Sequence, residues 1–409
     1  MSGFAYGFGL AAIWLFPACV GGFALNWYVL APALRRAAHE QRAITVTELI
    51  AGPPGTPRRR AVIVIASAII LLSLLTYVAA QFQGAGKAFA ETFEMAFEPA
   101  LLIGAGIVIF YTLMGGFWAA SLTDTIQGMV MAVAAIALPI VALAQVGPAQ
   151  LWASLTPDGV WVAASKGLGP VAAIGFVLGL LGIGLGYPGQ PHVVNRFMAL
   201  RDEQGVIVGR RIAMSWAVVI YAGMIGLGWA LRILLPGLAD REDAFMLGAD
   251  LLLPPVIAGV MIAAVLSAIM STVDSQLLVA ASTVSHDLLG SPGSEPDPSA
   301  LRRSRLTVLA ISIGAVLVAL WVDESIFSSV LFAWTAMGSA FGPVLLVTVL
   351  RRRPRTDWVL AAMVVGFVLS VAAHLWSVSK GGALERVLPF AIALALSLAG
   401  APAGGSRER

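Results

Sequence analysis

The chain has 409 residues, of which 59% are hydrophobic and only 11% are charged, and its formal net charge is +3. Soluble domains carry roughly 25% charged residues, so this composition excludes a water-soluble globular protein. The apolar residues gather in runs without a single charge, such as 61–86, 101–122 and 167–189. Each run is as long as the about 20 residues that a transmembrane helix needs. The sequence therefore predicts an all-α integral membrane protein.

In chain order, apolar stretches bounded by charges, Pro and Gly predict about eleven transmembrane helices. They lie at about 8–33, 61–84, 98–117, 119–146, 168–187, 207–231, 254–277, 304–322, 326–350, 357–376 and 386–403. No linker is long enough to separate domains, so we expect one transmembrane domain over 1–409. The single cysteine, Cys19, falls in the first span; it excludes an intramolecular disulfide, and we expect it to serve packing.

The predicted spans place alternate loops on opposite sides of the membrane, and Lys and Arg divide unevenly between the two sides. Most of the 25 lie at 35–60, 196–211, 302–305 and 351–355 or at the C-terminus, whereas the opposite loops hold few and also carry acids. Cytoplasmic loops are enriched in Lys and Arg. We therefore expect a cell (inner) membrane protein with its N-terminus outside and its C-terminus in the cytoplasm. Because the positive charge reports orientation, we expect no nucleic-acid partner.

Hydroxyl and carboxylate groups crowd the cytoplasmic half of one predicted span, at 266–276. Ser271, Thr272 and the carbonyl of Ala268, one turn earlier, could supply three oxygens to sodium, a hard cation that prefers oxygen ligands. The alternative is that the hydroxyls bond to carbonyls of their own helix, which is common for Ser and Thr in membranes. Spacing alone favours the alternative.

Two acids, Asp124 and Asp274, fall at the same cytoplasmic depth in this topology. Together they could draw a cation toward the cell interior, so we take both as candidate ion-exit residues. Asp124 also stands near the start of the predicted span 119–146, where an acid can cap a helix. The two roles are compatible.

A Gly- and Pro-rich cluster at 184–192 ends the fifth predicted span, and a second one lies at 338–343. Gly and Pro interrupt helices and free backbone groups, which transporters use to coordinate substrates and ions. The alternative is a plain helix end. We interpret His192 as a loop residue rather than a metal ligand, because no Cys, His or acid cluster accompanies it in the sequence.

At these motifs the chain resembles the sodium:solute symporter family, most closely its sodium/proline branch. The strings that carry the resemblance, in the family's order, include Asn26-Trp27, Thr123-Asp124-Thr125-Ile126-Gln127, Gly184-Leu185-Gly186-Tyr187, Gly189-Gln190-Pro191-His192, Arg196-Phe197-Met198, Met270-Ser271-Thr272 and Phe341-Gly342-Pro343. The resemblance implies a core of two inverted five-helix repeats. It also implies that sodium and solute enter together from outside and leave to the cytoplasm.

The resemblance assigns roles to individual positions. Those that match the sodium site are Ala268, Ser271 and Thr272, and Asp124 matches an acid near the ion exit. Those that match or neighbour the solute pathway are Tyr111, Tyr187 and Trp334. Ile183 stands where proline carriers place a tryptophan. It offers less aromatic surface, which leaves room for a solute other than proline.

Family members normally begin with two further helices, and the second of these, the broken first core helix, supplies the remaining sodium and substrate ligands. The resemblance begins after that helix, so the first core helix is missing here. Met1 is then a misplaced start or the start of a fragment. On that basis we expect that these 409 residues on their own do not couple sodium to transport.

The function expected for the parent protein is sodium-coupled uptake of a small organic solute, proline or a similar amino acid. The alternatives are sodium symport of pantothenate or of a short carboxylate, and a membrane domain that senses solute without moving it. The expected coupling ion is Na⁺, and the expected partners are the solute and the lipid bilayer. We do not expect an enzyme, because no nucleophile and base or metal cluster gathers in any predicted span.

Overall fold

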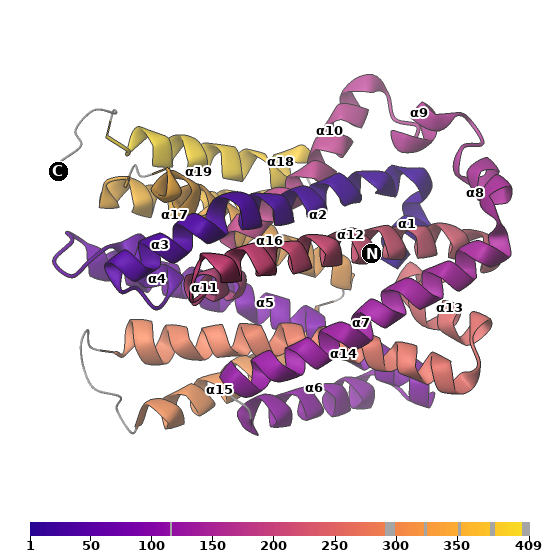
Figure 1. Ribbon diagram of the computed structural model, residues 1–409, viewed down its shortest axis with the longest axis horizontal. Coiled ribbons are helices and arrows are strands. Elements are labelled where there is room, and N and C mark those ends of the chain that lie inside the picture. The colour runs from indigo at the N-terminus through magenta and orange to yellow at the C-terminus, as the bar shows by residue number, and fades with distance from the viewer. Residues whose placement is uncertain (115–116, 291–298, 323–324, 351–352, 377–380, 403–409) are drawn as a thin grey trace.

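The computed structural model describes residues 1–114, 117–290, 299–322, 325–350, 353–376 and 381–402, without the side chains of 117–120. The described residues form helices and turns and contain no β-strand. Figure 1 shows the long helices bundled side by side. Helices suit this environment because lipid offers no partner for backbone N–H and C=O groups, which a helix satisfies internally.

The first half of the chain forms α1 (Ser2–Phe8), the 3-10 helix η1 (Gly9–Trp14), α2 (Leu15–Ala24), the π-helix η2 (Leu25–Leu30), α3 (Ala31–Gln41), α4 (Val46–Ala51), α5 (Arg59–Phe93), α6 (Phe97–Met114), α7 (Phe117–Val146), α8 (Pro148–Leu155), α9 (Val160–Ala164), α10 (Pro170–Leu181) and the 3-10 helix η3 (Gly182–Gly189). The second half forms α11 (Pro191–Met198), α12 (Glu203–Leu234), the 3-10 helix η4 (Arg241–Asp243), α13 (Ala244–Leu252), α14 (Pro255–Ser282), the π-helix η5 (Thr283–Leu288), α15 (Ser299–Trp321), α16 (Ile326–Val349), α17 (Thr356–Leu375), α18 (Ala383–Arg386) and α19 (Leu388–Ala399).

Ten helices in the described part of the chain are long and apolar enough to cross a membrane. Each overlaps one predicted span, and the first is longer than predicted because Ser2–Gln41 is continuously helical. The predicted eleventh span, 386–403, corresponds mainly to α19, which has 12 residues. At about 1.5 Å per residue that helix falls well short of a bilayer core. A span over 386–403 therefore stays a prediction.

Residues 115–116, inside the predicted span 98–117, lie outside the described residues.

The helix α5 has 35 residues and packs against α6, α14, α15 and α16. Its N-terminal half, with Ile70 and Leu74, joins an apolar cluster that also contains Phe341 of α16. Its other half, with Phe82, joins a cluster that contains Leu277 of α14. A helix that is apolar on several faces is buried among other helices. In this way α5 links the part of the bundle that carries α16 to the part that carries α14.

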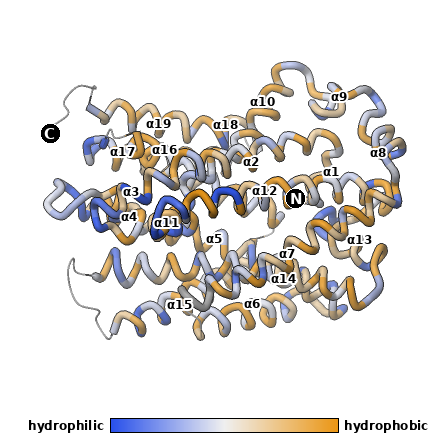
Figure 2. The backbone as a smooth tube through the Cα atoms, in the orientation of Figure 1, coloured by the Kyte–Doolittle hydropathy of each residue, from blue (hydrophilic) through white to orange (hydrophobic). Residues whose placement is uncertain are grey.

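The ends of the bundle differ from its middle in polarity. Figure 2 shows hydrophilic residues concentrated on α3, α4 and α11 at one end, and mostly apolar colours along the middle of the long helices. That end carries the arginine-rich segments around 35–60 and 196–211. Cytoplasmic segments of membrane proteins are enriched in Lys and Arg, so the predicted orientation assigns this basic end to the cytoplasm.

Candidate functional site

The 3-10 helix η3 interrupts the span that begins as α10, at the Gly- and Pro-rich sequence 182–189. A β-carbon on Gly184 would lie 2.4 Å from the carbonyl oxygen of Ala18 in α2. A β-carbon on Gly338 of α16 would lie 2.5 Å from the Cα of Gly186. Only glycine lets backbones approach this closely. The two Gly-rich motifs of the sequence therefore meet in space, and they hold η3 between α2 and α16.

Aromatic side chains from η3 and four other helices meet here, and we call them the aromatic cluster. Tyr187 of η3 meets Trp334 of α16 edge to face, with ring centroids 4.7 Å apart. Phe23 of α2 lies 5.2 Å from Tyr187, and Tyr77 of α5 lies 6.4 Å from Trp334, centroid to centroid. The hydroxyl oxygens of Tyr187 and Tyr221 of α12 are 2.5 Å apart. Such rings offer a rigid apolar surface with a few polar edges.

Three buried polar groups beside the aromatic cluster have bonding capacity left. Asn26 Nδ2 donates to the carbonyl oxygen of Tyr187 at 3.1 Å, and Gln190 Nε2 donates to that of Trp334 at 3.3 Å. Asn26 Oδ1, Gln190 Oε1 and Trp334 Nε1 have no hydrogen-bond partner within 3.5 Å among the described residues. Burying a polar group without a partner costs free energy, so these two acceptors and one donor are suited to a polar ligand.

The predicted substrate residues fall in two places. Ile183, which is 3% exposed, packs in the same apolar cluster as Tyr187, with Trp334 against it. Tyr111 lies elsewhere: it is on α6, and its hydroxyl donates to Thr123 Oγ1 of α7. The structure thus brings Ile183, Tyr187 and Trp334 together and places Tyr111 with the candidate ion-exit residues.

The three predicted sodium ligands lie together on α14. Ser271 Oγ donates to the carbonyl oxygen of Ala268 at 3.1 Å, and Thr272 Oγ1 donates to the same oxygen at 2.8 Å. These are the bonds to the own helix that the sequence allowed as the alternative. Each hydroxyl oxygen keeps lone pairs when its proton is donated, so the group still presents oxygen ligands from a single helical turn.

Arg196 of α11 links one predicted ion-exit acid, Asp124, to Ser275, which is the neighbour of the other, Asp274. Arg196 Nη2 contacts Asp124 Oδ2 at 2.5 Å and donates to Ser275 Oγ at 2.7 Å. Asp274, the neighbour of Ser275 in α14, accepts a hydrogen bond from the Thr112 hydroxyl. Asp124 Oδ1 and Asp274 Oδ2 have no hydrogen-bond partner among the described residues. The position of Asp124 inside α7, paired with Arg196, contradicts the interpretation that it caps the helix.

His192 differs from its interpretation as a loop residue, because it lies in the first turn of α11 with its ring 6.1 Å from that of Tyr77. The described residues contain no group of three or more His, Cys, Asp or Glu side chains placed to hold a metal ion.

Sequence reasoning missed six residues of these sites: Phe23, Asn26, Tyr77, Gln190, Arg196 and Tyr221. Asn26, Gln190 and Arg196 stood inside quoted motifs but had no role assigned. The two tyrosines had a signal of their own, since a hydroxyl at membrane depth needs an internal partner. Phe23 had none, because a phenylalanine in an apolar span is ordinary.

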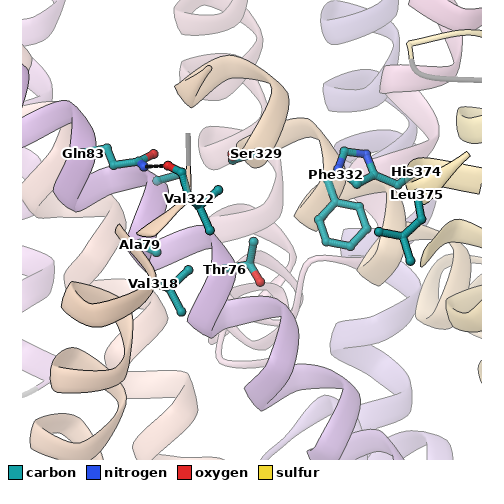
Figure 3. Close-up of a pocket in the computed structure, with 10 residues that line it drawn as sticks. Thr76, Ala79, Gln83, Val318, Val322, Ser329, Phe332, His374 and Leu375 are labelled. Carbon is teal, nitrogen blue, oxygen red and sulfur yellow. Dashed lines mark hydrogen bonds between the residues drawn. The ribbon is translucent and has the colours of Figure 1, made fainter. Parts of the chain in front are cut away.

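A separate cavity of about 250 Å³ lies between α5, α15, α16 and α17. Figure 3 shows His374 and Phe332 on one side of it and Gln83 on the other. The ring of His374 stacks on Phe332 at 4.2 Å, and its Nδ1 lies 2.8 Å from Glu385 Oε1. Gln83 Nε2 donates to the carbonyl oxygen of Val322 at 2.7 Å. These polar groups connect helix ends to one another, so we interpret the cavity as structural.

Comparison with known proteins supplies a family. The model of the sodium:solute symporter family matches residues 1–366 of this chain. The osmoregulated proline transporter OpuE of Bacillus subtilis is 33% identical over 402 residues, which cover 93% of this chain and 78% of the relative. The sodium/proline symporter of Salmonella typhimurium is 33% identical, with 88% of this chain and 73% of the relative covered.

Solved structures supply the fold. A sodium-coupled sialic acid symporter, solved in a substrate-bound outward-open state, matches with a TM-score of 0.72 at 18% identity, covering 98% of this chain and 84% of that one. A manganese transporter of Eremococcus coleocola matches with a TM-score of 0.51 at 15% identity, covering 97% and 91%. These likenesses confirm the all-α fold that the sequence predicts and the inverted five-helix-repeat transporter fold that the resemblance implies.

Proposed function

Since this chain belongs to the sodium:solute symporter family, we propose that the solute it carries with sodium is proline or a similar small amino acid. The names of the relatives, which include several proline transporters, support that class of solute. One structural observation carries the proposal further. Beside the aromatic cluster, one buried N–H donor and two buried oxygen acceptors are without partners in the described part of the chain.

A zwitterionic amino acid matches this set of groups. Its carboxylate can accept from the Trp334 indole, and its ammonium can donate to the amide oxygens of Asn26 and Gln190. Proline adds a compact apolar ring that can pack on Tyr187 and Trp334. Because the charged ends of the solute leave water on binding, each needs a protein partner to offset the cost of desolvation.

We propose that Ala268, Ser271 and Thr272 contribute to the sodium site. All three supply oxygen, the ligand type that a hard cation prefers. The carbonyl of Ala268 already accepts from both hydroxyls. For that carbonyl to face sodium, the two hydroxyl protons must rotate away. The hydroxyl oxygens can then bind the ion on the same side, so rotation of the two hydroxyl groups prepares all three ligands.

We further propose that Asp124 and Asp274 attract sodium toward the arginine-rich, cytoplasmic end, and that Arg196 competes with it. The guanidinium of Arg196 already contacts Asp124 and Ser275. Because the guanidinium of Arg196 can take the place of sodium on the Asp124 carboxylate, it makes the release of sodium easier.

The membrane potential supplies energy for this transport. One charge crossing about 100 mV gains roughly 2.3 kcal/mol. At about 1.4 kcal/mol per tenfold, that energy sustains about 50-fold accumulation of solute.

Uptake of labelled proline tests the proposal. It is measured in sodium and in choline, with the chain extended at its N-terminus to the length of its relatives and with the 409 residues alone for comparison. The extended protein is expected to accumulate proline in sodium only. Excess unlabelled pantothenate or a short carboxylate should not compete. Sodium-independent uptake would exclude the proposal, and proline binding without uptake would point to the sensing alternative.

A further inference from the structure

A shallow groove runs along the outside of the bundle between α7 and α12. Its volume is about 440 Å³, and its walls include Ile136 of α7 and Ile212, Trp216 and Val219 of α12. Ile136 is 45% exposed and Ile212 is 65% exposed, so no other helix covers them. The ring of Trp216 lies over Gly128 of α7, where a β-carbon would be 3.9 Å from Cη2.

A cation stands at one end of this groove. Arg211 of α12 lines it and is exposed, and the structure gives it no ion pair or hydrogen bond with any described residue. The adjacent Arg210 differs, because its guanidinium lies 4.5 Å from the ring centroid of Tyr28. One of the two neighbouring arginines is therefore engaged by the protein, and the other is free to meet a ligand.

The position of Arg211 along α12 indicates how deep its charge lies in the membrane. The helix α12 begins at Glu203, next to the arginine-rich segment that the positive-inside argument assigns to the cytoplasm. Arg211 lies near that start, and Trp216 and Val219 follow deeper in the span. The long side chain of Arg211 can extend to the level of the lipid headgroups, and the groove adds an apolar channel toward the bilayer centre. Tryptophan at this depth is typical of the membrane interface.

We propose that the groove binds one anionic phospholipid of the cytoplasmic leaflet. Its phosphate pairs with Arg211, and one acyl chain lies along the apolar walls between α7 and α12. Basic pockets between membrane helices on the cytoplasmic side bind anionic headgroups in this way. A zwitterionic lipid of the same chain length fits the groove equally well but carries a headgroup cation that Arg211 repels. The charge of the headgroup, not the acyl chain, therefore decides the preference.

Native mass spectrometry of the purified chain tests the proposal, with phosphatidylglycerol and phosphatidylcholine of identical acyl chains as probes. The chain is expected to bind one phosphatidylglycerol more tightly than phosphatidylcholine. Arg211→Gln should weaken that binding roughly fivefold, the effect of one cation near an anionic surface. Arg305→Gln is the matched control, because Arg305 is also exposed near the cytoplasmic end of a membrane helix, α15. It should leave the binding unchanged.

A second variant tests the groove itself while leaving the charge in place. Ile136→Trp fills the channel from an exposed position, so it should weaken phosphatidylglycerol binding although Arg211 is intact. Leu309→Trp, on the exposed face of α15, is its control. Equal affinity for the two lipids, equal loss in the Arg211 and Arg305 variants, or full binding by Ile136→Trp would each overturn the proposal. Size-exclusion profiles and helical content establish that the variants are folded.

Discussion

Trp334 presents an indole N–H donor that no acceptor in the described part of the chain meets within 3.5 Å. Its ring is held by Tyr187 and Tyr77 at 4.7 and 6.4 Å, and its backbone carbonyl accepts from Gln190. The side chain is thus fixed by its neighbours, while no described residue accepts from Nε1 within 3.5 Å. A donor prepared in this way recognises an anionic end of a solute at little cost in conformational entropy.

Replacing Trp334 by phenylalanine tests that role. The substitution keeps most of the aromatic surface and removes only the N–H, so maximal uptake should change less than affinity. Loss of a hydrogen bond to a charged group should raise the KM for the solute about 10- to 100-fold. Trp152→Phe, at an exposed position of α8, is the control for losing an indole. Initial rates of uptake give both constants, and an unchanged KM in Trp334→Phe would contradict the assignment.

At the scale of elements, the broken helix η3 depends on how closely it can approach α16. Gly186 and Gly338 meet backbone to backbone, and Gly189 faces the carbonyl of Met337, 2.4 Å from where its β-carbon would lie. No side chain fits between these two elements. The carbonyl of Trp334 and the ring of Tyr187 owe their relative placement to this contact. Packing of glycine against glycine therefore positions the aromatic cluster.

Gly338→Ala should lower the stability of the fold, because a β-carbon at that position would lie 2.5 Å from the Cα of Gly186. Overpacking of this kind typically costs about 1–3 kcal/mol. Gly175→Ala in α10 is a matched control, since nothing lies within 4 Å of its β-carbon. Alanine there should be neutral or stabilising by up to about 1 kcal/mol. Thermal unfolding in detergent compares the two, and equal midpoints would contradict the close-packing account.

A second element contact, between α4 and η5, depends on pH. Glu48 of α4 lies 3.3 Å from His286 Nε2 of η5, accepts from the backbone N–H of Ile44 at 2.9 Å and lies 3.7 Å from Arg59. The contact with His286, helped by the other two, outweighs burial and holds the pKa of Glu48 below its ordinary 4.5. The ionised form is favoured in the fold. Its contribution to stability is therefore present above pH 4.5 and lost as pH falls through the folded pKa.

Glu48→Gln should thus lower the thermal midpoint near neutral pH, and the difference from the wild type should shrink as pH falls below the ordinary pKa of the group. Glu203→Gln is the control, because that side chain is 74% exposed and its contacts to Arg35 and Arg36 are 3.9 and 3.8 Å. It should have little effect at any pH. A difference between Glu48→Gln and wild type that stays constant with pH would argue against the ionic contact.

At the scale of the whole molecule, the sequence predicts most of the fold because lipid imposes a simple rule on length and polarity. Ten of the predicted spans match helices that can cross a membrane. The eleventh corresponds mainly to the short α19, because apolar composition does not report that the helix breaks at Val387, between α18 and α19. The continuous first stretch Ser2–Gln41 was also underestimated, because charges at Arg35 and Arg36 mark the end of the apolar run but not of the helix.

The candidate site is predicted only in part, and the reason is tertiary. Ser271 and Thr272 share a turn, so their proximity follows from helical spacing alone. Contacts between residues of different helices do not follow from local sequence. Local sequence does not predict that Arg196 contacts Asp124, or that Tyr111 lies beside Thr123 rather than beside Tyr187. Those contacts depend on how α6, α7, α11 and α14 pack. Roles carried over from a family identify such residues, but their partners come from the structure.

The central claim is that oxygen atoms near the carbonyl of Ala268 hold the driving ion, and the double variant Ser271→Ala, Thr272→Ala tests it most directly. Solute uptake is measured against external sodium in the extended protein. Thr348→Ala is the control, because its hydroxyl bonds to a carbonyl of its own helix, at 2.8 Å, in the same manner. The account predicts that the double variant needs at least about tenfold more sodium for half-maximal uptake, while the control stays at the wild-type value. A double variant with an unchanged sodium dependence would contradict it.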